Sequence, residues 1–85
     1  MKIHIPDMEI ATILVQHMNN KIIGKTIYKS GLRKEYGVTI LAIKRGEKYI
    51  TSIGSEEVIK PDDTLYLFGT PDNIIKVNTY LSSTY

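Results

Sequence analysis

Polar and apolar residues in the first twenty positions follow two successive patterns. Residues 2–5 alternate between polar and apolar side chains, which predicts a short strand. A Pro-Asp pair then interrupts the alternation and offers a helix start. From residue 8 onward the apolar residues return at helical spacing, as Ile10, Ala11, Leu14 and Met18. We therefore predict a helix over residues 8–18, although the β-branched Ile13 and Val15 lose rotamer freedom in a helix.

Residues 21–37 have the pattern of a turn followed by a short helical stretch. Gly24 marks the turn, and Thr26 is placed to cap the start of the helix. Gly31 lies inside the stretch, where glycine weakens a helix by about 1 kcal/mol relative to alanine. Gly37 follows the last turn, where a left-handed residue commonly ends a helix. We predict one or two helical turns and a sharp stop, with three residues facing inward: Ile27, Leu32 and Tyr36.

The rest of the chain shows three strand patterns and one helix pattern. Residues 38–45 are apolar on both faces of the pleat, so we expect both faces of this strand to be covered. An Arg-Gly-Glu-Lys turn joins it to an alternating stretch at 48–53, and the two read as a hairpin. A Pro-Asp-Asp turn precedes the third strand, 64–68. Thr70 and Pro71 then predict the N-cap and first residue of a final helix.

Strands joined by hairpins make a mostly antiparallel sheet, and amphipathic helices need one of its faces. The predicted class is therefore α+β, with a small, mostly antiparallel β-sheet and helices packed on one face. We find no internal repeat and no linker, and we interpret residues 1–85 as a single domain. Its core would span about residues 21–82, with residues 1–20 as an N-terminal strand-helix extension.

Composition narrows the possible classes of protein. A lone chain of 85 residues buries only about 60–65% of its unfolded surface, so burial between two copies would add to its stability. The net charge is +2, and basic residues are interleaved with nine acidic ones, so we expect no nucleic-acid partner. No apolar run approaches the roughly 18–20 residues that span a bilayer, and the N-terminus is a poor signal peptide. We expect a cytoplasmic protein, or a cytoplasmic piece of a larger one.

The reactive residues form no catalytic or metal-binding pattern. His4 and His17 lie in different segments without a second imidazole at ligand spacing. The acidic residues at 56–57 and 62–63 lack the alternating ligands of an EF-hand, which favours turn chemistry over a calcium site. Residues 44–46 form a polar hairpin end, with a supporting contact to phosphate as the alternative. Because the chain has no cysteine and neither histidine has a Ser or Asp partner nearby, we expect no enzyme, metal or cofactor.

Two stretches resemble a known family, and together the resemblance covers residues 21–81. They are IIGKTIYKSGLRKEYGVTILAIKRGEKYI (22–50) and IKPDDTLYLFGTPDNIIKV (59–77). In order, they are similar to the Gly-Lys-Thr/Ser-Leu, Leu-Arg-x-x-(Tyr/Phe)-Gly, Ile-x-Ala-Ile-x-Arg-Gly and Pro-Gly-Asp-x-Leu motifs of the TrkA-C (RCK-C) family. That family is the regulatory module of bacterial and archaeal potassium transporters, channels and cation/proton antiporters. Asp62 replaces the glycine of the last motif, and Asp tolerates left-handed geometry moderately well.

The resemblance implies a homodimer and, in some members, a cyclic di-AMP site at the dimer interface. The matching ligand-binding positions are Arg33, Thr39, Ile27 and Tyr28. The family often has Asn where this chain has Thr39, which keeps a hydroxyl but loses the paired donor and acceptor of an amide. Residues 1–20 are outside the family's minimal core, and no nucleotide-binding Rossmann half precedes them. The chain is therefore expected to be a fragment of a longer protein.

Several alternatives remain at this level. Arg33 either binds an anion or is a helix residue that is solvated or bonds carbonyls near the helix end. Tyr36 is favoured as a core anchor over a ligand-stacking residue. The first functional reading is a ligand-sensing domain partnered with a membrane cation transporter or antiporter and a small nucleotide. The second is the effector domain of a transcription regulator. The third is a dimerisation module without a ligand.

Overall fold

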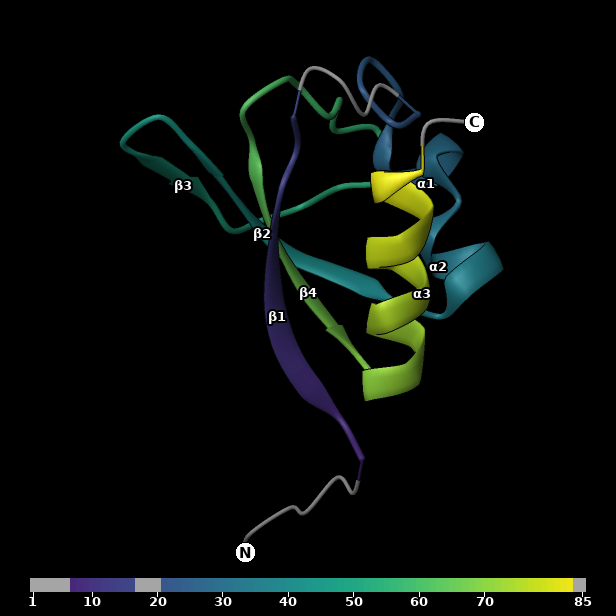
Figure 1. The fold of residues 1–85 in the computed structure, drawn as a ribbon. Coiled ribbons are helices and arrows are strands. Elements are labelled where there is room, and N and C mark those ends of the chain that lie inside the picture. The colour runs from purple at the N-terminus through teal and green to yellow at the C-terminus, as the bar shows by residue number, and fades with distance from the viewer. Residues whose placement is uncertain (1–6, 17–20, 84–85) are drawn as a thin grey trace, which may run out of the picture.

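The computed structural model describes residues 7–16 and 21–83. In chain order its elements are β1 (Glu9–Leu14), α1 (Ile27–Ser30), α2 (Leu32–Tyr36), β2 (Thr39–Arg45), β3 (Lys48–Ile50), β4 (Thr64–Gly69) and α3 (Pro71–Ser82). The strands form an antiparallel sheet in the order β1-β4-β2-β3. The helices lie on one side of this sheet (Figure 1). The predicted α+β class is confirmed, while the predicted strand at 2–5 falls outside the described residues.

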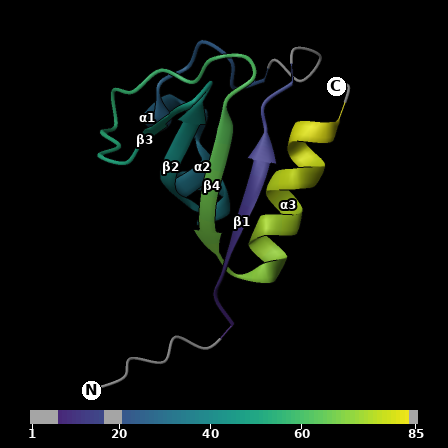
Figure 2. The same cartoon turned by 90° about the vertical axis from the view of Figure 1, so that its left-hand side faces the viewer.

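The prediction of a helix over residues 8–18 is wrong for the part that the structure describes. Residues 9–14 form β1, which pairs with β4 along its whole length, from Glu9 opposite Gly69 to Leu14 opposite Thr64. β-branched residues favour a pleated, half-buried surface, and a partner strand was available to provide one. The N-terminal segment is therefore an edge strand of the sheet, beside β4 in Figure 2.

Among the residues that the structure describes, the helices cover one face of β2 and leave the other partly exposed (Figure 1), so the expectation of two covered faces is wrong for a single copy. A β-bulge lies between Ile40 and Ala42, and the extra residue, Leu41, is 40% exposed. The bulge brings Ile40 and Ile43 to the same face, opposite Leu67 and Leu65 of β4. These four side chains are buried and belong to the core between the sheet and the helices.

The short helical stretch is divided at Gly31, which has a φ of +74° and separates α1 from α2. Gly37, at a φ of +67°, ends α2 as predicted, and its N–H donates to the Arg33 carbonyl at 2.9 Å. Asp62 adopts a φ of +70°, the left-handed geometry expected where the family has glycine. Strand β3 is shorter than predicted, ending at Ile50.

Helix α3 begins as the sequence predicts. The Thr70 hydroxyl accepts a hydrogen bond from the Asn73 N–H at 3.2 Å, and Pro71 opens the helix. Ile74, Val77 and Leu81 are buried against the sheet, whereas Ile75 is 61% exposed. No helix in the described ranges has the length and apolar character that crossing a membrane requires.

Candidate functional site

A pocket of about 480 Å³ opens between α1, α2, the start of β2 and the segment after β3. Its floor is apolar and consists of Ile27, Leu32, Val38, Ile40 and Ile53. Its rim carries the polar and exposed groups, which are Tyr28, Arg33, Lys34, Thr39, Gly54 and Ser55. Small-molecule sites commonly have about 300–1,000 Å³ and this mixture of apolar walls with a few polar groups. The pocket is therefore large enough for a small organic ligand.

The floor and the rim differ in exposure and charge. Leu32 and Val38 are almost completely buried, so the floor is continuous with the hydrophobic core. Arg33 and Lys34 are exposed at the mouth, and Tyr28 is 70% exposed beside them. Within residues 7–16 and 21–83, the Arg33 side chain has no ion-pair partner. An apolar cavity with two adjacent cations at its edge suits a ligand that joins a flat apolar ring to an anion.

The local sequence explains why α1 stands at this place. Thr26 caps α1, because its hydroxyl accepts the Lys29 N–H at 3.1 Å. The first amides of α1 are bonded by the loop after β3: the Ile27 N–H donates to the Glu57 carbonyl at 2.8 Å, and the Tyr28 N–H donates to the Ser55 carbonyl at 3.0 Å. Residues 54–59, which we call the wall segment, thus supply part of the rim and also hold α1.

The pocket brings together all the residues that the sequence indicated for ligand binding, namely Arg33, Thr39, Ile27 and Tyr28. Their role in binding remains a prediction. Tyr36 does not line the pocket; it packs against the core, with its ring centroid 5.3 Å from that of Tyr80. This position agrees with the interpretation of Tyr36 as a core anchor. The sequence analysis did not predict that the segment after β3 would line the pocket, through Ile53, Gly54 and Ser55.

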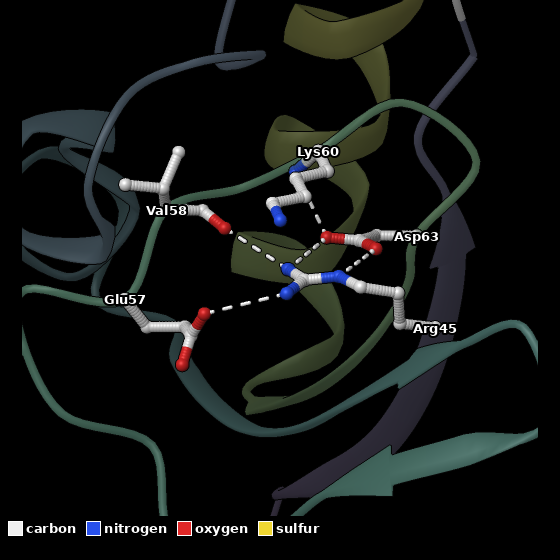
Figure 3. Close-up of polar contacts among 5 residues, drawn as sticks. All are labelled: Arg45, Glu57, Val58, Lys60 and Asp63. Carbon is white, nitrogen blue, oxygen red and sulfur yellow. Dashed lines mark hydrogen bonds and ion pairs between the residues drawn. The ribbon is translucent and has the colours of Figure 1, made fainter.

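A second polar cluster lies at the far end of β2, centred on Asp63 (Figure 3). Asp63 is fully buried, and Arg45 grips it through two hydrogen bonds, Nε to Oδ1 and Nη2 to Oδ2, both 2.8 Å long. The Lys60 N–H donates to Asp63 Oδ2 at 2.9 Å. Arg45 also donates to the Val58 carbonyl at 3.0 Å and approaches Glu57 at 3.4 Å. The guanidinium therefore joins the sheet to the wall segment.

These contacts determine the charge state of the pair. Burial alone would raise the pKa of Asp63, but the hydrogen bonds from Arg45 and from the Lys60 amide outweigh it and lower the pKa below its ordinary value. The hydrogen bond to Asp63 raises the pKa of Arg45 in turn. Both groups are charged at neutral pH, in the bidentate geometry that makes such pairs strong.

Residues 44–46 lie at the end of the β2–β3 hairpin, as the sequence predicts, and the cluster gives Arg45 a partner other than phosphate. Arg45 does not line the pocket; it binds the Asp63 carboxylate. The structure brings the two residues together because β2 and β4 are antiparallel with Lys44 opposite Thr64, which places Arg45 beside Asp63. That register could not be fixed from the sequence because the bulge at Leu41 shifts it. Among the described residues, no group of three potential metal ligands is gathered in one place.

Comparison with protein families decides the classification. The family model for the TrkA-C domain matches residues 10–82, from β1 to the end of α3. The chain belongs to the TrkA-C domain family. The resemblance inferred from the sequence is thereby confirmed, and TrkA-C domains are regulatory rather than catalytic modules.

Three known proteins show how similar domains occur. Potassium channel protein 1 of Methanocaldococcus jannaschii is 39% identical over 75 residues, which are 88% of this TrkA-C chain and 22% of that protein. The C domain of the potassium transport protein KtrA, solved with cyclic di-AMP, superposes with a TM-score of 0.76 at 25% identity, covering 86% of this chain and 82% of its own. This chain thus spans less than a quarter of the channel protein but most of the KtrA domain.

The third protein is BusR of S. agalactiae, which has been solved with cyclic di-AMP and with promoter DNA. Its RCK_C domain dimer with cyclic di-AMP has a TM-score of 0.76 and 29% identity, covering 85% of this chain and 93% of that one. BusR bound to its busAB-promoter DNA has a TM-score of 0.78 and 27% identity, covering 95% of this chain and 38% of that one. TrkA-C domains of this fold therefore occur in both potassium transport proteins and a DNA-bound protein.

Proposed function

We propose that this TrkA-C domain is a ligand-sensing regulatory domain of a bacterial potassium or cation transport protein, and that two copies bind cyclic di-AMP between them. The observation that carries the proposal is the pocket, because Arg33, Thr39, Ile27 and Tyr28 meet around one cavity. The KtrA and BusR domains that share the fold were solved with this ligand, and the BusR domain as a dimer. In this account the domain acts at the cytosolic face of the membrane.

The chemistry of the pocket suits each part of the ligand. The Arg33 guanidinium can form a charge-assisted, often bidentate, pair with a phosphate, and Lys34 adds a second positive charge at the mouth. Ile27 and the ring of Tyr28 provide apolar surfaces for an adenine. A cyclic dinucleotide has two phosphates and two bases related by a twofold axis, so two copies of the pocket facing each other would match it.

Binding would regulate the transporter by a shift in population. A ligand held by two copies favours the dimer geometry in which both pockets face it, and disfavours other arrangements. An attached pore or antiporter would respond to this difference in free energy between geometries. The proposal requires no catalytic step.

The proposal is tested by calorimetric titration of the full chain with cyclic di-AMP, cyclic di-GMP and AMP. We expect heat of binding with cyclic di-AMP, and roughly a 10- to 100-fold weaker affinity in Arg33→Ala, since a hydrogen bond to a charged group contributes about 1.5–3 kcal/mol. Lys29→Ala is the matched control, because it removes one positive charge from an exposed residue outside the pocket. Its affinity should stay within about twofold of the original.

Absence of heat and of any thermal shift with all three nucleotides would refute the ligand and favour a dimerisation module without one. Equal losses in Arg33→Ala and Lys29→Ala would refute the direct contact, because only the general positive field would then matter.

A second candidate function is the effector domain of a transcription regulator, which the similarity to the DNA-bound BusR favours. The two candidates differ in their partners and not in the pocket. Affinity purification from cells with a tag on the full chain separates them: a membrane transport protein in the eluate supports the first, and promoter DNA or a DNA-binding polypeptide supports the second.

A further inference from the structure

The wall segment, residues 54–59, is held to the sheet by Arg45. The guanidinium donates from Nη2 to the Val58 carbonyl at 3.0 Å and approaches Glu57 Oε2 from Nη1 at 3.4 Å. Figure 3 shows both contacts on the side of the guanidinium away from the Arg45 backbone. The same guanidinium is fixed by its two bonds to the buried Asp63. One side chain therefore connects a rigid point of the sheet to a loop.

The wall segment in turn holds α1 through the backbone. Besides the two bonds from Ile27 and Tyr28, the Ile59 N–H donates to the Lys25 carbonyl at 2.9 Å, and Thr26 and Val58 form an antiparallel bridge. Residues 24–28 thus lie beside the wall segment like a short strand pair. Any displacement of the wall segment would carry with it the two residues of α1 that line the pocket.

Glu57 joins the two sets of contacts. Its carboxylate faces Arg45, while its backbone carbonyl accepts the Ile27 N–H at 2.8 Å. A change in the contact between Arg45 and Glu57 is therefore transmitted to Ile27, and so to the pocket, through Glu57 alone. None of the three groups involved, Arg45, Glu57 and Val58, lines the pocket itself.

We propose that Arg45 is a positioning residue of the pocket: by holding Glu57 and Val58 it sets where α1 stands, and thereby sets ligand affinity without touching the ligand. The effect on affinity rests on the proposed function, whereas the effect on α1 does not. The chemistry requires the planar fork of arginine, because Asp63 accepts from two of its N–H groups and the wall segment accepts from two more.

Two variants of the full chain test this role, Glu57→Gln and Arg45→Lys. Glu57→Gln is the cleaner one, since it leaves Arg45 and Asp63 paired, and an ion pair with side chains 26% and 29% exposed contributes little to overall stability. Glu56→Gln is the matched control, because it makes the same change of charge at the neighbouring, exposed position. Amide hydrogen exchange and titration with cyclic di-AMP are measured on all of them.

In the ligand-free protein, we expect the amides of Ile27 and Tyr28 to exchange roughly threefold faster in Glu57→Gln and roughly tenfold faster in Arg45→Lys. The amides of Leu65 and Leu67 in the central strand should keep their rates in Glu57→Gln. Affinity for cyclic di-AMP should fall as well, and it should fall further in Arg45→Lys than in Glu57→Gln. Glu56→Gln should match the original protein in both measurements.

Unchanged exchange at Ile27 and Tyr28 in both variants would overturn the positioning role. Faster exchange with unchanged affinity would overturn the claim that this position sets ligand binding. If the original protein takes up no cyclic di-AMP at all, the proposed function fails, and the exchange rates alone decide whether Arg45 positions α1.

Discussion

Asp63 shows how much one residue can contribute to a small domain. Its carboxylate is fully buried, and three hydrogen bonds from Arg45 and the Lys60 amide offset the cost of removing this charge from water. Its backbone also joins neighbouring segments, since its carbonyl accepts the Val15 N–H at 2.8 Å. Removing one partner of a buried ion pair leaves the other charge without compensation, which costs more than the pair contributes.

We therefore expect Asp63→Asn to lower the free energy of unfolding by about 3 kcal/mol at pH 7. The folded-state pKa of Asp63 is lowered, so its stabilisation is complete above about pH 5 and is lost as the pH falls through the unfolded pKa of about 3.9 toward the lower folded pKa. Denaturant unfolding between pH 3 and 7 measures both effects. The difference between Asp63→Asn and the original protein should shrink at low pH.

Glu56→Gln serves as the control, because this exposed carboxylate should change stability by less than about 0.5 kcal/mol at every pH. A constant difference between Asp63→Asn and the original protein from pH 7 to pH 3 would contradict an ionised, paired Asp63.

Thr39 is the position where the chain departs from the family's usual asparagine. In Thr39→Asn the amide adds a donor and an acceptor at the rim of the pocket, so we expect cyclic di-AMP to bind about fivefold tighter, the equivalent of about one hydrogen bond. Thr39→Val, which removes only the hydroxyl, should bind severalfold weaker. Calorimetric titration measures both, and equal affinities in all three proteins would exclude Thr39 from the site.

At the scale of elements, strand β1 shows where sequence patterns are ambiguous. In residues 9–14, apolar side chains fit a helical stripe through Ile10 and Leu14 and also a strand face through Ala11 and Ile13. The choice depends on β4, whose edge pairs with β1 and which begins 50 residues after β1 ends. The local helix signals of α3, by contrast, were sufficient, because its cap and first turn are formed by residues adjacent in sequence.

A pair of isoleucine variants separates the strand from the helix. In β1, Ile13 packs against the core, whereas Ile10 is 62% exposed on the other face of the sheet. We expect Ile13→Ala to lower the free energy of unfolding by about 1–2 kcal/mol, and Ile10→Ala to change it by less than about 0.5 kcal/mol. Both variants remove the same atoms, so intrinsic strand preference cancels in the comparison.

Denaturant unfolding at pH 7 measures the two values. A larger loss in Ile10→Ala would contradict the register of β1 with β4, because a helix over residues 8–18 would turn Ile10 inward.

Part of the pocket was predictable because most of its proposed ligand-binding residues lie close together in the sequence. Arg33 and Thr39 lie within one continuous motif with Ile27 and Tyr28, so a family resemblance over residues 22–50 was enough to select them. The wall segment was not predicted, because its place depends on hydrogen bonds to residues about 30 positions earlier, such as that from Ile27 to Glu57. Long-range backbone contacts of this kind leave no periodic signal in a single sequence.

At the scale of the whole molecule, the strand order could not be predicted from the sequence. Hairpin-joined strands predict neighbours, and β2 and β3 do pair, but β4 lies between β1 and β2. Within the described part of the chain, one face of the sheet carries no helix (Figure 2). Ile10, Leu14 and Tyr49 are exposed in the single chain. The pocket, by contrast, opens on the side of α1 and α2.

The central claim is that two copies enclose a single symmetric dinucleotide, and the direct test is its stoichiometry. Calorimetric titration with cyclic di-AMP, combined with a measurement of the mass of the complex by light scattering, gives the number of chains and ligands together. The account predicts one cyclic di-AMP for every two chains, in a particle with the mass of a dimer. A complex with one nucleotide per chain, or a protein that remains a monomer at high concentration while saturated with ligand, would contradict it.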